Sequence, residues 1–314
     1  MNLKIGTFNL FQFCSPSFSF YTKKEKFSKE DFQEKKSWIK EQILKMNCDF
    51  IGFQEVFSQD ELKDLVLECG FKEFIVVDEP KLDDKNQVFK TTTVGFASKF
   101  PIKQVEKVSR ADNFTFAREP IKAIISLEND LNLTIYVAHL KSNRLNEFEY
   151  KFTQNSTFEE KIEKFHIAQK NNYSLSLKQR IDEAKTLHFD IKREKNPSIL
   201  VCDLNDKEFS ITIEALTNKR FYIKDLKKDD YILFDSYYLA PKEIYNPHPE
   251  AKEIKRTPTS YFVGYGNTLD FIFVSKNLKN SIKKYKVFDE HLQKNKNGSL
   301  KQSDHAQVVC EIEI

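Results

Sequence analysis

Short apolar runs and longer amphipathic segments alternate along the whole of this 314-residue chain. The short runs are rich in Val, Ile, Thr and Phe and are followed at once by polar residues, which is typical of buried β-strands. Residues 121–127 and 131–138 are separated by a tight Glu-Asn-Asp turn and predict an antiparallel pair. The strands that this pattern predicts lie near residues 3–9, 49–53, 74–77, 91–98, 121–127, 131–138, 199–203, 231–238, 268–275 and 306–314.

Apolar residues at a spacing of three to four predict the helices between these strands. Ser28 and Ser58 each precede such a segment and have an acidic residue three positions later, which is the pattern of an N-terminal cap. Gly70 suits the C-terminal end of the second helix. The predicted helices span residues 29–46, 59–69, 177–191 and 211–216, with partly helical sequence at 158–169.

Many strands with interspersed helices and antiparallel turn signals predict an α+β fold in which packed sheets have helices outside them. No shift of composition marks a boundary, so we expect residues 1–314 to form a single domain. Two segments interrupt the pattern and are interpreted as insertions. One, near residues 143–176, is polar with mixed charge, and the other, near 241–259, carries four prolines and is expected to be a surface loop.

Composition narrows the class of protein. With 40% hydrophobic residues the chain can bury a large core, and a net charge of +3 is too small to establish a polyanionic partner. Five scattered cysteines without a CxxC pair argue against a disulfide framework and against a structural zinc site. The first ten residues lack the apolar run of a signal peptide, and no stretch approaches the ~20 apolar residues of a membrane span. We therefore expect a cytoplasmic protein without a membrane span, and a monomer.

The apolar run Ile199–Val201 is followed directly by Asp203, Asn205 and Asp206. Because side chains alternate along a strand, Asp203 and Asn205 are expected to point the same way and could hold a cation, a water molecule or a phosphate. An ordinary polar turn explains the same residues equally well. The interpretation as a binding site gains support because other predicted strands also end in polar groups. These groups are Asn9, Glu55, His139 and the pair Asp304 and His305.

Asp270 stands within an apolar run, where an unpaired carboxylate is costly, so it requires a partner such as a histidine. Histidines held by carboxylates move protons near neutral pH, and Mg²⁺ prefers carboxylate and water oxygens. Each residue alone is more simply a satisfied polar group. Together they predict metal-assisted hydrolysis of a phosphoester, provided that the fold brings them together.

Six short segments occur in one order over nearly the whole chain: residues 5–10 (IGTFNL), 52–56 (GFQEV), 137–142 (VAHLKS), 202–206 (CDLND), 268–275 (TLDFIFVS) and 303–306 (SDHA). In this order they resemble the endonuclease/exonuclease/phosphatase superfamily, which has the DNase I-like fold. A seventh segment, residues 116–120 (FAREP), is similar to the phosphate-contacting arginine segment of the DNase I branch. The resemblance implies a four-layer α/β sandwich, with two mainly antiparallel sheets flanked by helices and an active site at one edge.

The resemblance also implies a role for each matching residue. Glu55 is the expected principal Mg²⁺ ligand, with Asn9 and Asp304 as further ligands, and Mn²⁺ is a possible substitute. Arg118 is expected to grip a non-scissile phosphate in a bidentate manner.

The catalytic roles follow from the same resemblance. Asp203 and Asn205 are expected to position or activate the attacking water. His305, oriented by Asp270, is expected to act as the general base or to stabilise the charge of the phosphorane. His139 is expected to stabilise that charge or to protonate the leaving oxygen.

Departures from the family pattern only slightly restrict which branch of the family the chain resembles. Cys202 replaces the usual glycine, and Phe8 stands where DNA-repair members often carry tryptophan. Leu269-Asp270-Phe271 replaces the Cys-Asp-Arg signature of inositol-polyphosphate phosphatases, and the His-Leu-Lys-Ser run is more similar to the bacterial nuclease-type branch. The lysine-rich stretch at 276–301 could follow a nucleic-acid backbone or could equally be a solvated loop.

Three functions are compatible with the sequence. The first is a Mg²⁺-dependent phosphodiesterase, a nuclease acting on DNA or RNA. The second is a phosphatase or phosphodiesterase for a phospholipid headgroup, an inositol phosphate or another small phosphoester. The third is a non-catalytic member that binds a phosphorylated partner. Against it stands the intact set of site residues, namely Glu55, Asp203, Asn205, Asp270, Asp304 and His305.

Overall fold

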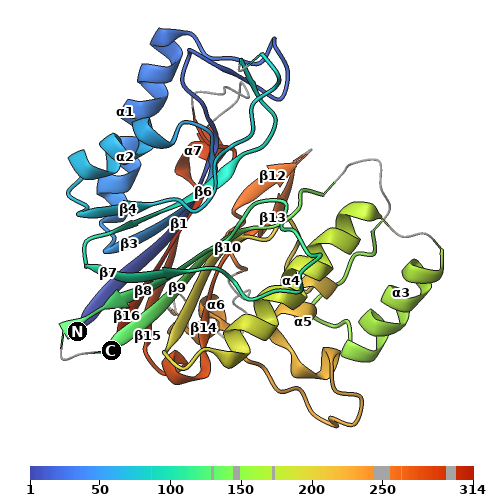
Figure 1. Cartoon of the computed structure of the whole chain (residues 1–314). Helices are drawn as coiled ribbons and strands as arrows, with labels where there is room; N and C mark the ends of the chain where they lie inside the picture. Colours follow the sequence, from blue (N-terminus) through green and yellow to red (C-terminus); the bar gives the residue numbers. More distant parts are fainter. Residues whose placement is uncertain are drawn as a thin grey trace.

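The computed structural model describes residues 1–85, 87–128, 131–143, 149–171, 174–242, 255–262, 264–294 and 302–314. Within these residues two six-stranded sheets pack face to face (Figure 1). The first sheet has the order β15 (Ile282–Phe288), β16 (Gln307–Glu313), β1 (Asn2–Phe13), β3 (Phe50–Val56), β6 (Thr93–Ser98) and β4 (Glu73–Ile75). The second has the order β11 (Leu233–Asp235), β14 (Asp270–Ser275), β10 (Ser198–Asp203), β9 (Asn132–His139), β8 (Ile121–Ser126) and β7 (Ile102–Glu106).

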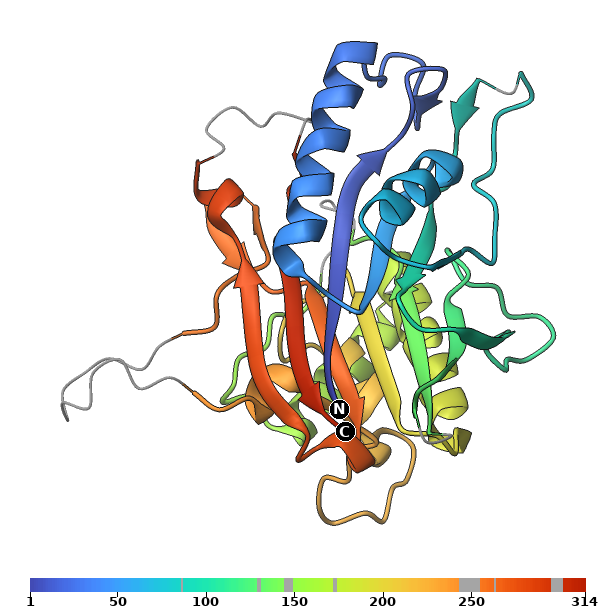
Figure 2. The same ribbon diagram turned by 90° about the vertical axis from the view of Figure 1, so that its left-hand side faces the viewer.

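Each sheet contains one parallel pair, β1 with β3 and β9 with β10, and its other pairs are antiparallel. The helices lie on the outer faces, as Figures 1 and 2 show. The prediction of mainly antiparallel sheets flanked by helices is therefore confirmed. The helices are α1 (Lys29–Met46), α2 (Gln59–Glu68), α3 (Phe158–Lys170), α4 (Leu175–Arg193), α5 (Ile211–Thr217), α6 (Ser236–Leu239) and α7 (Glu290–Lys294).

Three hydrophobic clusters fill the spaces between the four layers. One packs α1 and α2 against the first sheet, one lies between the sheets, and one packs α4 and α5 against the second sheet. The alternation of side chains along β3 places Phe50 in the cluster between the sheets and Ile51 in the cluster beneath α1. Burial of both faces explains why the strand segments read as nearly continuous apolar runs.

The predicted helix at 29–46 is confirmed, and its cap forms as expected, because Asp31 N donates to Ser28 Oγ at 3.0 Å. The helix after Ser58 also forms, but its predicted side-chain cap is wrong. The Ser58 hydroxyl is instead the acceptor for Ser15 N at 2.8 Å, so it fixes the loop that follows β1.

Three strand predictions need correction. The first strand does not end at Asn9 but continues through a bulge to Phe13. The run 231–238 divides into β11 and the short helix α6, because Asp235 caps that helix through Tyr237 N. Part of the lysine-rich stretch is not a loop but β15, an edge strand whose exposed Lys283, Lys284 and Lys286 protect it from pairing with other chains.

Some predicted features fall wholly or partly outside the described residues. These are the turn residues 129–130, parts of the two insertions (144–148, 172–173 and 243–254) and the lysines within 295–301. Among the helices that the structure does describe, none is long and apolar enough to cross a lipid bilayer. Smaller elements are β2 (Ser19–Phe20), β5 (Val88–Phe89), β12 (Ser260–Phe262), β13 (Tyr265–Asn267), η2 (Lys219–Phe221) and η3 (Lys276–Leu278).

Gly52 faces the second sheet at very close range. A Cβ atom at this position would lie 2.4 Å from Val201 Cγ2 and 2.9 Å from Val137 Cγ1. No real side chain tolerates such distances, so the sheets reach this spacing only with glycine here. The residue lies three positions before Glu55 on the same strand, and the spacing of the sheets at Gly52 therefore also sets the depth of the site.

We expect Gly52→Ala to lower the free energy of unfolding by about 1–3 kcal/mol, because overpacking outweighs the entropic gain of alanine in a strand. Denaturant unfolding of the purified variant measures this loss. The double variant Gly52→Ala/Val201→Ala is the control, since removing the Val201 methyl groups should make the two losses less than additive. Equal or greater stability of Gly52→Ala would show that the sheets can separate at this point without cost.

Candidate active site

Strand direction brings the predicted site residues to one edge of the sandwich. The parallel strands β9 and β10 end at His139 and Asp203, while the antiparallel neighbour β14 begins at Asp270. In the pairing register Asp203 lies opposite both His139 and Asp270. These three residues are therefore neighbours across the second sheet, although 131 positions separate the first from the last in the sequence.

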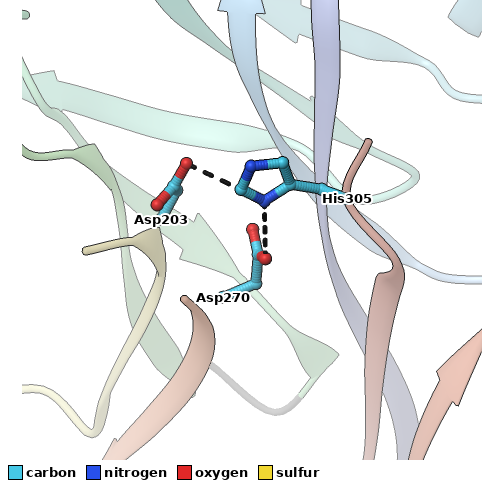
Figure 3. Close-up of side chains that lie close together, drawn as sticks. All are labelled: Asp203, Asp270 and His305. Carbon is cyan, nitrogen blue, oxygen red and sulfur yellow. Dashed lines mark hydrogen bonds and ion pairs between the residues drawn. The ribbon is translucent and has the colours of Figure 1, made fainter. Parts of the chain in front are cut away.

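The first sheet completes the cluster through two hydrogen-bonded contacts. Asn9 Nδ2 donates to Asp203 Oδ2 at 2.9 Å. His305, just before β16, has its Nδ1 atom 2.8 Å from Asp270 Oδ2 and 4.0 Å from Asp203 Oδ2 (Figure 3). The histidine partner that Asp270 was expected to need is thus His305, and the site bridges the two sheets.

Two buried hydroxyls fix the backbone around this cluster. Ser303 Oγ donates to the Asn9 carbonyl at 2.6 Å and accepts from His305 N at 3.0 Å. Thr259 Oγ1 accepts from Leu269 N and Asp270 N, at 2.9 and 3.2 Å. Together they join β1 to His305 and set the start of β14.

Bulges in β1 and β3 aim the residues near Glu55. Phe11, Gln12 and Glu55 have φ values of 49°, 63° and 60°, a region that non-glycine residues rarely occupy. The bulge directs Phe11 N to Asn9 Oδ1 and Gln12 N to Glu55 Oε2, both at 2.9 Å. Bulges of this kind re-aim side chains next to functional sites.

Asn205 and Arg118 converge on a single carbonyl. Asn205 Nδ2 donates to Leu140 O at 3.0 Å, and Arg118 Nη1 donates to the same oxygen at 2.9 Å. Arg118 Nη2 also lies 3.2 Å from Ser142 Oγ, and Asn205 N donates to Asp203 Oδ1 at 2.8 Å. Arg118 therefore lies beside Asn205, at the same edge of the sandwich as Asp203.

The protonation states of Asp203 and His305 depend on each other. Burial raises the pKa of the Asp203 carboxyl to about 7, with Asp270 acting in the same direction and His305 against it. For His305, burial lowers the pKa, but the carboxylates of Asp270 and Asp203 outweigh burial and hold the pKa well above its ordinary value. His305 is thus a cation at neutral pH, while Asp203 is able to exchange a proton there.

His139 differs from His305 in its charge state. Its Nε2 lies 3.5 Å from Asp203 Oδ2, and burial, together with Arg118 and His305, lowers its pKa well below the ordinary value. The imidazole is therefore neutral. Within the described part of the chain its buried Nδ1 has no hydrogen-bond partner.

Two acidic groups could hold a divalent cation. Burial raises the pKa of Glu55, and the exposed Asp304 raises it further, so these carboxylates lie close enough to repel each other. A bound cation would offset that repulsion, and oxygen donors are the ligands that Mg²⁺ prefers. The two carboxylates therefore fit such a cation. Asn9, the further predicted ligand, has its Nδ2 engaged by Asp203 and its Oδ1 by Phe11 N.

A second cluster, Asp203, Asp270 and His305, also has potential ligand atoms within 4.8 Å of one another. Here, however, His305 Nδ1 is already engaged by Asp270, and the imidazolium charge opposes a cation. These features make the Asp203 cluster less suited to a cation than the acidic pair Glu55 and Asp304.

The sequence reasoning missed Lys35, a fully buried lysine of α1. Its Nζ lies 3.5 Å from Gln302 O, and 5.8 and 5.5 Å from the ring centroids of Phe11 and Phe27. Burial lowers its pKa to about 7, against the opposing pull of Glu55 and Asp304. A lysine on the apolar face of an amphipathic helix was the signal that could have identified it.

Glu183 of α4 was also missed. This buried carboxylate accepts from Ala117 N and Lys141 N, both at 2.7 Å, and from Gln179 Nε2 at 3.1 Å. Through these hydrogen bonds Glu183 holds the segment that carries Arg118 close to the segment that follows His139. In sequence its only signal is an acid that interrupts the apolar face of the predicted helix.

Comparisons with known proteins agree with this geometry. The family model described as "Endonuclease/Exonuclease/phosphatase family" matches residues 6–305. No curated protein sequence matches the chain. Solved structures with the same fold include a D. rerio TDP2 humanized by 14 mutations, with 11% identity and a TM-score of 0.60, covering 100% of this chain and 99% of that one.

Two further structures are similar at this level. The human Nocturnin catalytic domain with bound sulfate has 16% identity and a TM-score of 0.58, covering 99% of this chain and 93% of that one. The Bacteroides thetaiotaomicron mannosyl-6-phosphatase Bt3783 has 14% identity and a TM-score of 0.54, covering 99% and 100%. Proteins of this family hydrolyse phosphoester bonds and generally depend on divalent metals, and the chain belongs to the endonuclease/exonuclease/phosphatase family.

Proposed function

We propose that the chain is a Mg²⁺-dependent phosphodiesterase that cleaves nucleic acid, DNA or RNA. The observation that carries the proposal is the pair of contacts across the two sheets, Asn9 to Asp203 and Asp270 to His305. They place an acidic edge suited to a cation beside a carboxylate and an imidazolium that are suited to proton and charge chemistry. Arg118 lies next to them for a second phosphate.

Mg²⁺ bound by Glu55 and Asp304 would supply positive charge against the negative charge that gathers on a phosphate under attack. Asp203, with a pKa of about 7, is the residue best suited to accept a proton from the attacking water near neutral pH. The backbone N–H of Asn205 holds Asp203 Oδ1, so the other carboxylate oxygen faces Asn9 and the two histidines.

His305, unlike Asp203, is not expected to accept a proton from the attacking water. Its raised pKa makes it a poor general base, so of the two expected roles we assign the stabilisation of phosphorane charge to the imidazolium, with Asp270 orienting the ring. The neutral His139, whose Nε2 lies 3.5 Å from Asp203 Oδ2, is our choice for the group that faces the leaving oxygen. Under these assignments Asp203 can accept a proton near neutral pH, while His305 stays protonated and His139 stays neutral.

The first experiment measures hydrolysis of bis(p-nitrophenyl) phosphate, plasmid DNA and labelled RNA with Mg²⁺, with and without chelator. We expect cleavage that chelator abolishes, and a loss of at least about 100-fold in kcat for both Glu55→Gln and His305→Ala, because each removes charge stabilisation of the transition state. Glu73→Gln and His166→Ala, which change exposed residues of β4 and α3, are the matched controls and should keep full activity.

Binding of Mg²⁺ is measured separately, as the metal-dependent rise in melting temperature. Glu55→Gln should reduce this rise, while His305→Ala should not. Turnover of the small diester without cleavage of DNA or RNA would favour a small-phosphoester enzyme. Metal and oligonucleotide binding without turnover of any substrate would favour a non-catalytic member and contradict the proposal.

We also expect Glu183→Gln to lower kcat/KM for the labelled DNA or RNA substrate about tenfold, mainly by raising KM, because Arg118 is proposed to contact a phosphate other than the scissile one. The amide presents a donor to one of the two backbone N–H groups, so the segments around Arg118 and Lys141 separate. Steady-state kinetics of Glu183→Gln, Arg118→Ala and the double variant measure this effect. Glu163→Gln, at an exposed position of α3, is the control.

If Glu183 acts through Arg118, adding Glu183→Gln to Arg118→Ala should cause little further loss. Fully additive losses would show instead that Glu183 is independent of Arg118 and has only a structural role.

A further inference from the structure

A groove on the outside of the second sheet lies apart from the catalytic edge. It has a volume of about 740 Å³ and lies between the segment that joins β7 to β8 and the helix α4. We infer that it binds the phosphate backbone of a single-stranded nucleic acid whose scissile bond occupies the active site. This inference rests on the proposed function and specifies its substrate. The lining of the groove includes Arg110, Phe114, Lys185, Phe189, Lys192 and Arg193.

The chain segment that forms one wall of the groove leads toward the active site. Ser109 N donates to Asp190 Oδ2 at 2.6 Å, and Gln179 Nε2 donates to Thr115 O at 3.0 Å. The 109–117 segment therefore runs antiparallel to α4, from the C-terminal end of the helix toward its N-terminal end. The next residue in this segment is Arg118, at the catalytic edge.

The length of α4 indicates how far the end of the groove lies from the active site. Glu183 contacts the segment beside Arg118, and Lys192 lies nine residues further along the helix, which corresponds to about 14 Å of helix axis. The far end of the groove is thus a few nucleotides of an extended strand away from the catalytic edge. A substrate of one or two phosphates could not reach both places at once.

The charge of the lining is predominantly positive. Four cationic side chains face one carboxylate, Asp182, which lies 3.7 Å from Lys185. Arg110 is paired with Glu119. Lys192 and Arg193 are exposed, and among the described residues no carboxylate lies within 4.0 Å of either. These two cations are available to a polyanion.

Aromatic rings lie among these charges. Phe189 is 44% exposed, between the helix turns that carry Lys185 and Lys192, and Phe114 lines the opposite wall. An exposed ring beside cations is the arrangement by which proteins stack the bases of a single strand while they track its backbone. A polyacidic peptide would satisfy the charges but would have no flat group to place against Phe189. We therefore favour nucleic acid.

The test is the variant Lys192→Glu/Arg193→Glu, which reverses both exposed charges and touches no residue that we place in the catalytic machinery. Its matched control is Lys227→Glu/Lys228→Glu, which makes the same change on the exposed turn before β11. Cleavage of a fluorescent 20-nucleotide single strand, as DNA and as RNA, is compared with cleavage of bis(p-nitrophenyl) phosphate. Melting temperatures verify that each variant is folded, and Lys192→Ala/Arg193→Ala removes the charges without reversing them.

We expect the charge-reversed variant to lose at least about tenfold in kcat/KM for the oligonucleotide at low salt and nothing for the small diester. The control should keep both activities. Oligonucleotide binding, measured by fluorescence polarisation in the Glu55→Gln background, should lose about 1.4 units of slope against log salt, because two phosphate contacts are removed. Phe189→Ala should weaken binding without changing this slope.

Other results would overturn the inference. One is an unchanged oligonucleotide cleavage in the variant, and another is an equal loss on the small diester. A third is competition by polyglutamate as effective as competition by unlabelled oligonucleotide. Failure of the proposed function would be distinguishable, since the wild-type protein would then bind the oligonucleotide through Lys192 and Arg193 but hydrolyse neither substrate.

Discussion

The site depends on the spacing between two sheets that do not share a single strand. Each sheet carries half of the site residues, and the halves meet through the hydrogen bonds of Asn9 with Asp203 and of His305 with Asp270. Gly52 sets that spacing, because any side chain there would meet Val201. Core packing therefore determines hydrogen-bond geometry at the catalytic edge, and a shift of one ångström between the sheets would break both contacts.

Much of this arrangement is predictable from sequence because its signals are local. A buried strand that ends in Asp203, and a lone Asp270 in an apolar run, indicate a site and its need for a partner without any structure. The register then follows from the strands, since Asp203 lies opposite both His139 and Asp270. The family resemblance added the order of the segments, and the fold class and the helix α1 were confirmed.

What the sequence could not provide arises from contacts between distant elements. The bulges that turn Phe11, Gln12 and Glu55 to positive φ have no composition signal, because none of these residues prefers that region. Glu183 acts on two backbone N–H groups that lie 24 residues apart in the chain, a relation that no periodicity encodes. The strand β15 was not predicted either, because the exposed lysines of this edge strand give the sequence the polar character of a loop.

Lys35 is a buried basic group whose charge interacts with the acidic groups Glu55 and Asp304. A buried ammonium is costly, and its lowered pKa of about 7 measures that cost, yet Glu55 and Asp304 act to keep it charged. The same two carboxylates repel each other, as the raised pKa of Glu55 indicates. The ammonium and the proposed cation would therefore act on the same pair of acids. Because the pKa of Lys35 is about 7, the side chain near neutral pH is divided between its charged and neutral forms, and in its charged form it offsets the repulsion between the two acids.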